Sequence, residues 1–141
     1  MAWALYNFGM GYKTRANNNI VYICTYHVVW CVKYRRPLLT EEIGDRLKEI
    51  VAGVIANTNS ELHEIETMPD HVHVLVGCDP SFGIPRLVRL MKGRSSHHLR
   101  QEYAPLRTRV PSLWTTATFI ATTGGAPLVA IKRYIENQRP V

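Results

Sequence analysis

The chain has 141 residues, of which 46% are hydrophobic and 20% are charged, and its formal net charge is +6. These values predict one soluble globular domain, and no stretch reaches the roughly eighteen consecutive apolar residues that a membrane span needs. The start of the chain lacks a secretory signal, and the three cysteines form no CxxC pair, so we expect a cytoplasmic protein without a disulfide framework or zinc knuckle.

The first third of the chain predicts a leader, a strand and a helix. Residues 1–19 mix aromatic residues with glycine and show no sustained period, so we expect a loosely ordered leader. Residues 20–33 are rich in β-branched and aromatic residues, which predicts a long strand. Thr40, followed by two glutamates, predicts the start of a helix whose apolar stripe extends to Ile55.

The rest of the chain predicts two further strands, a helix, a strand and a last helix. Residues 61–68 and 71–78 are expected to form an antiparallel hairpin around Pro69-Asp70. A basic amphipathic helix follows from residue 84 to residue 103, and then a β-like run from 113 to 123. The last helix, residues 126–139, has a proline near its first turn and follows a pair of glycines, Gly124 and Gly125.

The order of the predicted elements favours a known α+β architecture. The first six elements follow the split β-α-β-β-α-β pattern of a ferredoxin-like or RRM-like fold, an antiparallel sheet with helices on one face. We therefore expect residues 20–141 to form a single domain. The C-terminal helix, which carries Tyr134, is an addition to this pattern, and Gly124 and Gly125 would give it the freedom of a hinge.

Positive charge is concentrated in one segment. The segment from 86 to 109 contains seven basic residues and a single acid, Glu102, and a smaller basic group lies near position 35. Such a patch suits a polyphosphate partner such as nucleic acid, although an ordinary solvated helix face explains it as well from charge alone. The candidate DNA contacts are Arg35, Arg36, Arg86, Arg89, Lys92 and Arg94.

Two histidines interrupt an apolar strand. His71 and His73 are two residues apart, so their side chains point to the same face and can bind one cation or one phosphate. The alternative is a pair of hydrogen-bonded edge histidines. A histidine-triad nucleotide hydrolase is excluded, because Leu75 stands where that class needs its nucleophile. Asp70, next to His71, is a candidate for orienting an imidazole.

The last helix places a tyrosine and an amide on one face. Tyr134 and Gln138 are four residues apart, which aligns them along a helix. A phenolate can attack a phosphodiester when a cation polarises the phosphorus, and Gln138 could offer its amide oxygen to that cation. The alternative for Tyr134 is a half-buried aromatic residue in the apolar stripe of the helix.

Five separated blocks, in order and with similar spacing, resemble one family. They are "YHVVWCVKYRRPLL" (26–39), "MPDHVHVLV" (68–76), "LMKGRSS" (90–96), "LW" with "FIATTGG" (113–125) and "IKRYIENQ" (131–138). This set resembles the TnpA-type single-tyrosine HUH transposases of the smallest bacterial and archaeal insertion sequences, and the REP-associated tyrosine transposases share the motifs.

The resemblance implies a role for each motif. His71, His73 and Gln138 would bind a divalent metal, Mg²⁺ or Mn²⁺, and Tyr134 would open single-stranded DNA at hairpin-flanked ends through a 5′-phosphotyrosine link. Members of the family form homodimers whose active sites combine the histidines of one subunit with the tyrosine helix of the other. We therefore expect a prokaryotic, DNA-associated enzyme.

Two other functions are also compatible with the sequence. A domesticated HUH relative that processes genomic palindromes would use the same local chemistry. A non-catalytic RRM-like module would instead bind nucleic acid by stacking bases on aromatic residues of the sheet face that carries His71 and His73.

Overall fold

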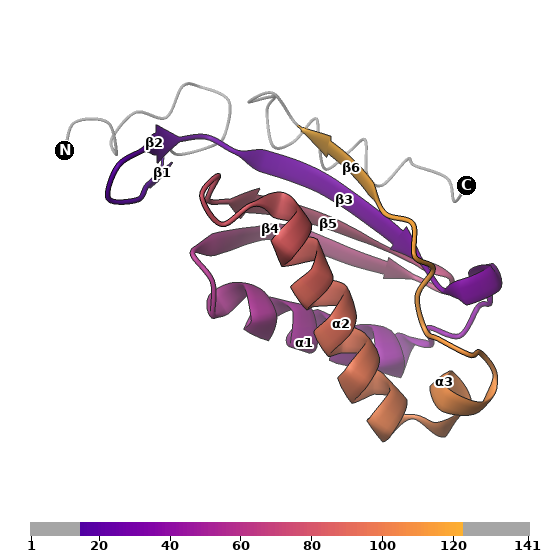
Figure 1. Ribbon diagram of the computed structural model, residues 1–141. Helices are drawn as coiled ribbons and strands as arrows, with labels where there is room; N and C mark the ends of the chain where they lie inside the picture. Colours follow the sequence, from indigo (N-terminus) through magenta and orange to yellow (C-terminus); the bar gives the residue numbers. More distant parts are fainter. Residues whose placement is uncertain (1–14, 123–141) are drawn as a thin grey trace.

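The computed structural model describes residues 15–122, which are coloured in Figure 1. Residues 1–14 of the expected leader, Gly124, Gly125 and the expected helix 126–139 lie outside this range. Within it, none of the helices is both long enough and apolar enough to cross a membrane. In chain order the elements are β1 (Arg15–Ala16), β2 (Val21–Tyr22), β3 (Thr25–Cys31), η2 (Lys33–Arg35), α1 (Glu41–Ala56), β4 (Ser60–Met68), β5 (His71–Cys78), α2 (Ile84–Glu102), α3 (Ala104–Thr108) and β6 (Phe119–Thr122).

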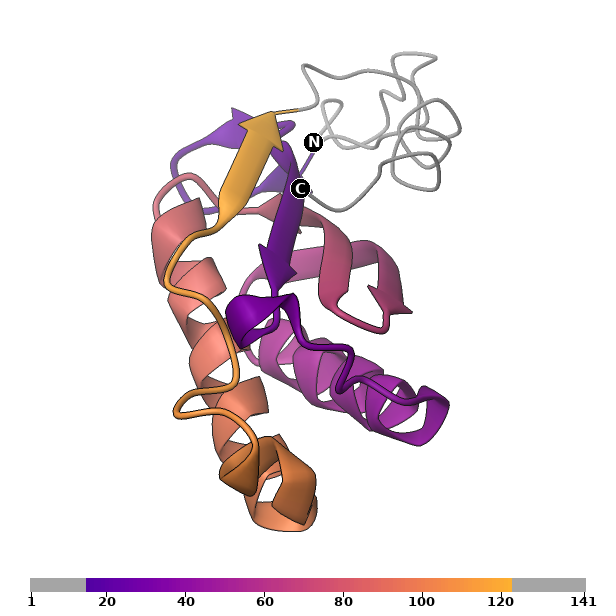
Figure 2. The same cartoon turned by 90° about the vertical axis from the view of Figure 1, so that its right-hand side faces the viewer.

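The main sheet has four strands in the order β4-β5-β3-β6, and every neighbouring pair is antiparallel. Helices α1 and α2 lie on the same side of this sheet, as the two views in Figures 1 and 2 show. The sequence of elements β3-α1-β4-β5-α2-β6 is the split β-α-β-β-α-β pattern. The predicted ferredoxin-like α+β fold is therefore confirmed.

The beginning of the described chain differs from the prediction. The end of the expected leader, residues 15–19, belongs to a small hairpin in which β1 pairs with β2. The Asn17 carboxamide oxygen accepts the backbone N–H groups of Asn19 and Ile20, both at 2.8 Å, and this closes the turn. The expected strand 20–33 is consequently two strands, β2 and β3, separated by Ile23 and Cys24.

Helix α1 begins where the sequence predicts. The hydroxyl of Thr40 accepts the backbone N–H of Ile43 at 3.3 Å, and two glutamates occupy the first turn, where the helix dipole favours negative charge. At Gly44 the helix passes close to β4, because a Cβ atom built there would lie 2.6 Å from the Thr67 hydroxyl oxygen. A larger residue at this position would push the helix away from the sheet.

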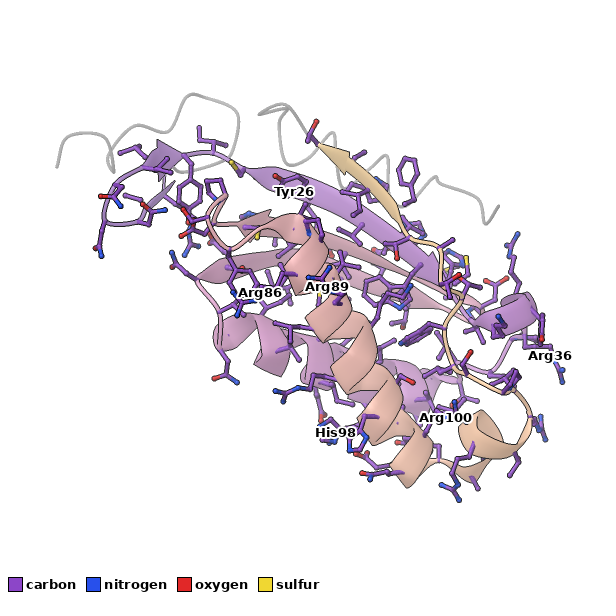
Figure 3. All side chains as sticks on the ribbon, in the orientation of Figure 1. Tyr26, Arg36, Arg86, Arg89, His98 and Arg100 are labelled. Atoms are coloured by element: carbon purple, nitrogen blue, oxygen red, sulfur yellow. The ribbon has the colours of Figure 1, made fainter. Side chains whose placement is uncertain are left out.

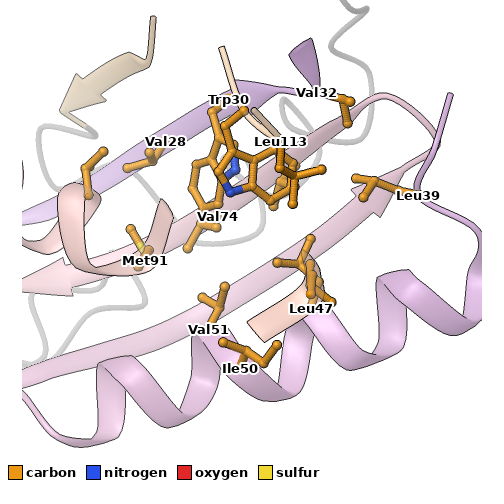
Figure 4. Close-up of a cluster of buried hydrophobic side chains, with 14 of the residues drawn as sticks. Val28, Trp30, Val32, Leu39, Leu47, Ile50, Val51, Val74, Met91 and Leu113 are labelled. Atoms are coloured by element: carbon orange, nitrogen blue, oxygen red, sulfur yellow. The ribbon is translucent and has the colours of Figure 1, made fainter. Parts of the chain in front are cut away.

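The hydrophobic core lies between the sheet and the two long helices (Figure 4). Val72, Val74 and Val76 of β5 point into it and are fully buried, together with Leu47 of α1 and Met91 of α2. The strand period of two then sends the intervening residues of β5 to the opposite face of the sheet.

The segment between α2 and β6 departs from the predicted strand. A short helix, α3, follows α2 directly, and β6 begins only at Phe119. Trp114 is instead a core residue, with its ring edge-on to Trp30 at a centroid distance of 5.9 Å and its Nε1 donating to Ser95 Oγ at 3.1 Å. Because the Trp114 indole packs on the helix side of the sheet and its N–H is satisfied there, the chain around Trp114 does not continue as a regular strand.

Candidate metal and nucleic-acid site

Strand β5 places its two histidines side by side on the face of the sheet away from the helices. His71 and His73 are buried, with 1% and 2% of their surface exposed. Their ring centroids are 4.6 Å apart and the ring planes meet at 70°. The planes are inclined rather than parallel, so lone pairs from the two rings can point toward a common position.

One nitrogen of each ring has no hydrogen-bond partner among the described residues. These atoms are His71 Nε2 and His73 Nδ1, and both are buried. A buried polar atom without a partner costs free energy unless something else satisfies it. Two adjacent imidazole nitrogens of this kind fit the donor set of a divalent cation.

The protonation state of His73 also suits metal binding. The pKa of His73 is lowered to about 4. Burial is the largest cause, and the nearby imidazoles of His71 and His27 add to it. The ring is therefore neutral at physiological pH. Only a neutral imidazole has the lone pair that a metal ligand needs.

Asp70 holds the other nitrogen of His71. Its Oδ1 lies 2.6 Å from His71 Nδ1, and its Oδ2 lies 3.2 Å from the Nη2 atom of Arg35. A carboxylate accepts but does not donate, so Nδ1 carries the proton and Nε2 is left with its lone pair. This is the arrangement by which carboxylates orient histidine ligands of metals.

Arg35 reaches Asp70 from an irregular turn, η2, at the end of β3. Tyr34 and Arg35 both have positive φ angles, 58° and 53°, which residues with side chains rarely adopt. The Val32 N–H donates to the Asp70 carbonyl at 2.9 Å and ties this turn to the start of β5. The guanidinium of Arg35, a candidate DNA contact, is therefore already engaged with a carboxylate.

The described residues do not supply a complete metal site. Cys31 is the cross-strand neighbour of His71, but burial raises the pKa of its thiol and so disfavours the thiolate that binds metals. No group of three His, Cys, Asp or Glu side chains within residues 15–122 could hold an ion. Gln138, the expected third ligand, and Tyr134 lie outside that range.

His27 is a residue of this face that the sequence did not single out. It lies on β3, is 3% exposed, and its ring stacks on His73 with centroids 5.9 Å apart and planes 14° apart. Burial lowers the pKa of His27. The sequence signal that could have identified His27 is its position in the strand, since residues 27, 29 and 31 share one face of β3.

Most of the predicted DNA contacts are exposed, but they lie in different regions (Figure 3). Arg86, Arg89 and Arg94 lie on α2, on the helical side of the sheet. Arg36 follows η2 at the end of the sheet that carries His71. The structure therefore divides the predicted basic set between helix α2 and the turn at one end of the sheet.

Lys92 is engaged differently from the arginines of α2. Its ammonium donates to the Thr115 carbonyl at 2.7 Å, the Thr118 hydroxyl at 2.9 Å and the Ala117 carbonyl at 3.2 Å. Burial lowers the pKa of this amine. All three donor positions of the ammonium are used within the fold, so Lys92 fixes the loop that leads into β6.

Comparisons with known proteins identify the family of this chain. Residues 20–138 match the family described as "Transposase IS200 like". The chain is 37% identical to the ISDra2 transposase TnpA of Deinococcus radiodurans over 128 residues, which cover 89% of this chain and 91% of that protein. It is 26% identical to the IS200 transposase of Salmonella typhimurium over 117 residues, which cover 82% of this chain and 76% of the relative.

Solved structures give the same result. A crystal structure of a Deinococcus radiodurans transposase superposes with a TM-score of 0.73 at 32% identity and covers 90% of this chain and 99% of that one. A REP-associated tyrosine transposase bound to a REP hairpin shares the fold, with a TM-score of 0.57 at 13% identity over 86% of this chain and 69% of its own. Because the family match spans nearly all of the sequence and carries the histidine pair, the chain belongs to the IS200-like transposases.

Proposed function

We propose that this transposase is a metal-dependent enzyme that cleaves and rejoins single-stranded DNA at hairpin-flanked ends. The observation that carries the proposal is the pair of buried imidazole nitrogens, His71 Nε2 and His73 Nδ1, which lack partners among the described residues. Core histidines that serve only packing normally have their ring nitrogens satisfied.

A divalent cation, Mg²⁺ or Mn²⁺, fits these nitrogens, with Gln138 as the proposed third ligand. Bound there, such an ion would polarise a phosphodiester and stabilise the negative charge that develops on its oxygens. Asp70 would keep Nδ1 of His71 protonated, so that the Nε2 lone pair stays directed at the site.

Tyr134 is the proposed nucleophile. Its phenolic oxygen, after losing its proton, would attack phosphorus and displace the 3′-oxygen, which leaves as a free 3′-OH while the tyrosine keeps the 5′-phosphate. A 3′-OH of another strand end would then attack the phosphotyrosine and release the phenol. The number of phosphoester bonds is conserved, so rejoining needs neither water nor a high-energy cofactor.

The DNA partner is proposed to carry a hairpin. One structural neighbour is described as bound to a REP hairpin, and the exposed arginines of this chain offer charges for phosphates. We assign that role to Arg36, Arg86, Arg89 and Arg94. Arg35 and Lys92, which were also candidates, have their charges engaged with Asp70 and with the loop before β6.

A homodimer with shared active sites is the proposed assembly, and β6 is the edge that supports it. Phe119 and Ile120 of this edge strand are 50% and 38% exposed, whereas the other edge strand, β4, carries Glu61, Glu64 and Glu66. Exposed apolar edges favour pairing with another strand, while charges disfavour it.

The C-terminal helix would complete the partner's site. Gly124 and Gly125 come shortly after β6 in the sequence, separated from it by one residue, so a pivot there would carry the helix 126–139 with Tyr134 and Gln138 across the proposed interface. The cytoplasm of a prokaryotic cell, with the protein on DNA, is the proposed location. A domesticated copy that processes genomic palindromes would use the same chemistry, and the DNA that flanks the gene would distinguish it.

A non-catalytic RRM-like module is less well supported. Such a module would present stacking aromatic residues where this sheet face carries His71 and His73. The orientation of His71 by a carboxylate has no purpose in base stacking.

The experiment is to incubate the full chain with Mg²⁺ or Mn²⁺ and single-stranded DNA that contains the hairpin flanking the gene. We expect a protein–DNA adduct that resists denaturation, and we expect none with Tyr134→Phe, His73→Ala or EDTA. Tyr103→Phe, at the junction of α2 and α3, is the matched control and should form the adduct normally. No adduct with the wild type, or an equal amount with Tyr134→Phe, would refute the mechanism.

A further inference from the structure

Four aromatic rings form a continuous row across the histidine face of the sheet. The row runs from Phe119 on β6 through His27 on β3 to His73 and His71 on β5. Phe119 meets His27 edge-on at a centroid distance of 6.0 Å, His27 stacks on His73 at 5.9 Å, and His73 meets His71 at 4.6 Å. Each contact lies within the range of favourable aromatic pairs.

The two histidines of β5 are held in different ways. His71 has the Asp70 carboxylate on its Nδ1, at 2.6 Å. His73 Nδ1, the nitrogen proposed to bind the cation, has no hydrogen-bond partner among residues 15–122. The last side-chain torsion of a histidine is broad, so the direction of this nitrogen depends on what packs against the ring. Among residues 15–122, the rings of His27 and His71 contact the ring of His73.

His27 is placed to fix the ring of His73. Its ring lies nearly parallel to that of His73, with 14° between the planes, and both residues are buried. A flat ring packed in this way restricts rotation of its neighbour, because turning either ring would open a void or create a clash in a close-packed region. Phe119, from β6 on the other side of β3, meets the ring of His27 edge-on.

The same geometry argues against His27 as a metal ligand. The lone pair of an imidazole lies in the plane of its ring, and two stacked rings lie in separate planes, so their lone pairs do not meet at one point. The planes of His71 and His73, inclined by 70°, do allow such convergence.

We propose that His27 is a positioning residue of the metal site, whose ring holds the imidazole of His73 in the orientation that binds the cation. This inference rests on the proposed function, since it assumes that His71 and His73 bind a metal. It assigns two means of orientation to one ligand pair, a carboxylate for His71 and a stacked ring for His73.

The test is a Mn²⁺ titration of the full chain at neutral pH, in which electron paramagnetic resonance measures the free ion. His27→Leu removes the ring and should raise the Kd for Mn²⁺ about tenfold, as changes around metal ligands do. His27→Phe keeps a flat ring without nitrogen and should bind Mn²⁺ almost as the wild type does. His27→Met is a second variant without a ring, should His27→Leu fail to fold.

Two controls separate the possible failures. Val28→Ala, on the same strand but facing the helices, should lower the melting temperature and leave the Kd unchanged. Equal Mn²⁺ binding by the wild type and His73→Ala would refute the metal site itself. If His73→Ala loses binding, then either a normal Kd for His27→Leu or an equal loss in His27→Phe would refute the positioning role alone.

Discussion

The carboxylate of Asp70 bridges Arg35 and His71, at 3.2 Å to the guanidinium and 2.6 Å to the ring nitrogen. One anion thus connects the turn after β3 with the first residue of β5. The bridge gives His71 a fixed tautomer and a fixed ring orientation, which are properties of a ligand prepared before its ion arrives.

Replacing Asp70 tests whether this orientation of His71 supports metal binding. Asp70→Asn keeps the size of the side chain but removes the charge that holds both Arg35 and the Nδ1 proton. We expect the Kd for Mn²⁺ to rise about 10- to 100-fold, with a parallel loss of DNA adduct. Glu49→Gln, on the exposed surface of α1, is the control and should change neither. An unchanged Kd in Asp70→Asn would show that the contact does not serve metal binding.

Neighbouring arginines should give different phenotypes. Arg35→Gln removes the partner of Asp70 and should weaken Mn²⁺ binding, although less than Asp70→Asn does. Arg36→Gln removes an exposed charge and should instead reduce the salt dependence of DNA binding, with the slope falling by about 1. Mn²⁺ titration and DNA-binding isotherms at several salt concentrations distinguish the two. The assignment is wrong if Arg35→Gln changes only the salt slope.

Stability should fall as the pH is lowered from neutrality toward pH 4. The pKa of His73 is lowered to about 4 in the folded state, from a usual value near 6.5. Between these values the unfolded chain binds a proton that the folded chain does not, so the free energy of unfolding rises with pH across this window. Urea unfolding of the wild type and His73→Asn at several pH values should show a smaller slope in the variant.

Val28→Ala is the control for this pH series. It removes core packing and should lower stability by a similar amount at each pH, without changing the slope. An identical slope in the wild type and His73→Asn would show that the buried ring of His73 does not contribute to the pH dependence of the free energy of unfolding.

The fold was predictable where local signals were strong. The bounds of β5 were predicted correctly, because residues 71–78 alternate and a proline–aspartate turn precedes them. The start of α1 followed from its threonine cap. The break between β2 and β3 was missed, because β-branched and aromatic residues continue through Ile23 and Cys24 and only tertiary pairing interrupts the strand.

The candidate site was predictable in part. The common orientation of His71 and His73 follows from the strand period, whereas their contacts with Asp70 and His27 depend on ring orientation and on the register between β3 and β5. The basic pattern of α2 could not separate Lys92 from the arginines, because its partners lie more than twenty residues away in the loop before β6.

Because Lys92 is hydrogen-bonded within the fold and Arg94 is exposed, substitutions at these two positions of α2 should affect different properties. Lys92→Met leaves the carbonyls of the loop before β6 without their donor and should cost about 1–3 kcal/mol of unfolding free energy. Arg94→Gln should leave stability unchanged and lower the salt slope of DNA binding by about 1. Chemical denaturation and DNA-binding isotherms on both variants check this, and a reversed result would return Lys92 to the DNA-binding set.

The proposed dimer makes β6 sensitive to charge. Ile120→Glu places a carboxylate on an exposed edge strand and should convert a dimer to a monomer, because like charges on paired strands repel. Light scattering after size-exclusion chromatography measures the mass. Glu61→Gln, on the other edge strand, should leave the dimer intact. A monomeric wild-type protein would refute the assembly, and a dimer that persists in Ile120→Glu would refute this interface.

The turn at Tyr34 and Arg35 has a cost that the rest of the fold must meet. Two consecutive residues in the left-handed region store strain of about 1–2 kcal/mol each, and neither is the glycine that would relieve it. A relaxed turn would leave Arg35 free in solvent and Asp70 without its counter-charge. The protein thus gives up part of its folding energy to keep the Arg35 guanidinium against Asp70, and selection for thermal stability alone would favour glycine in this turn.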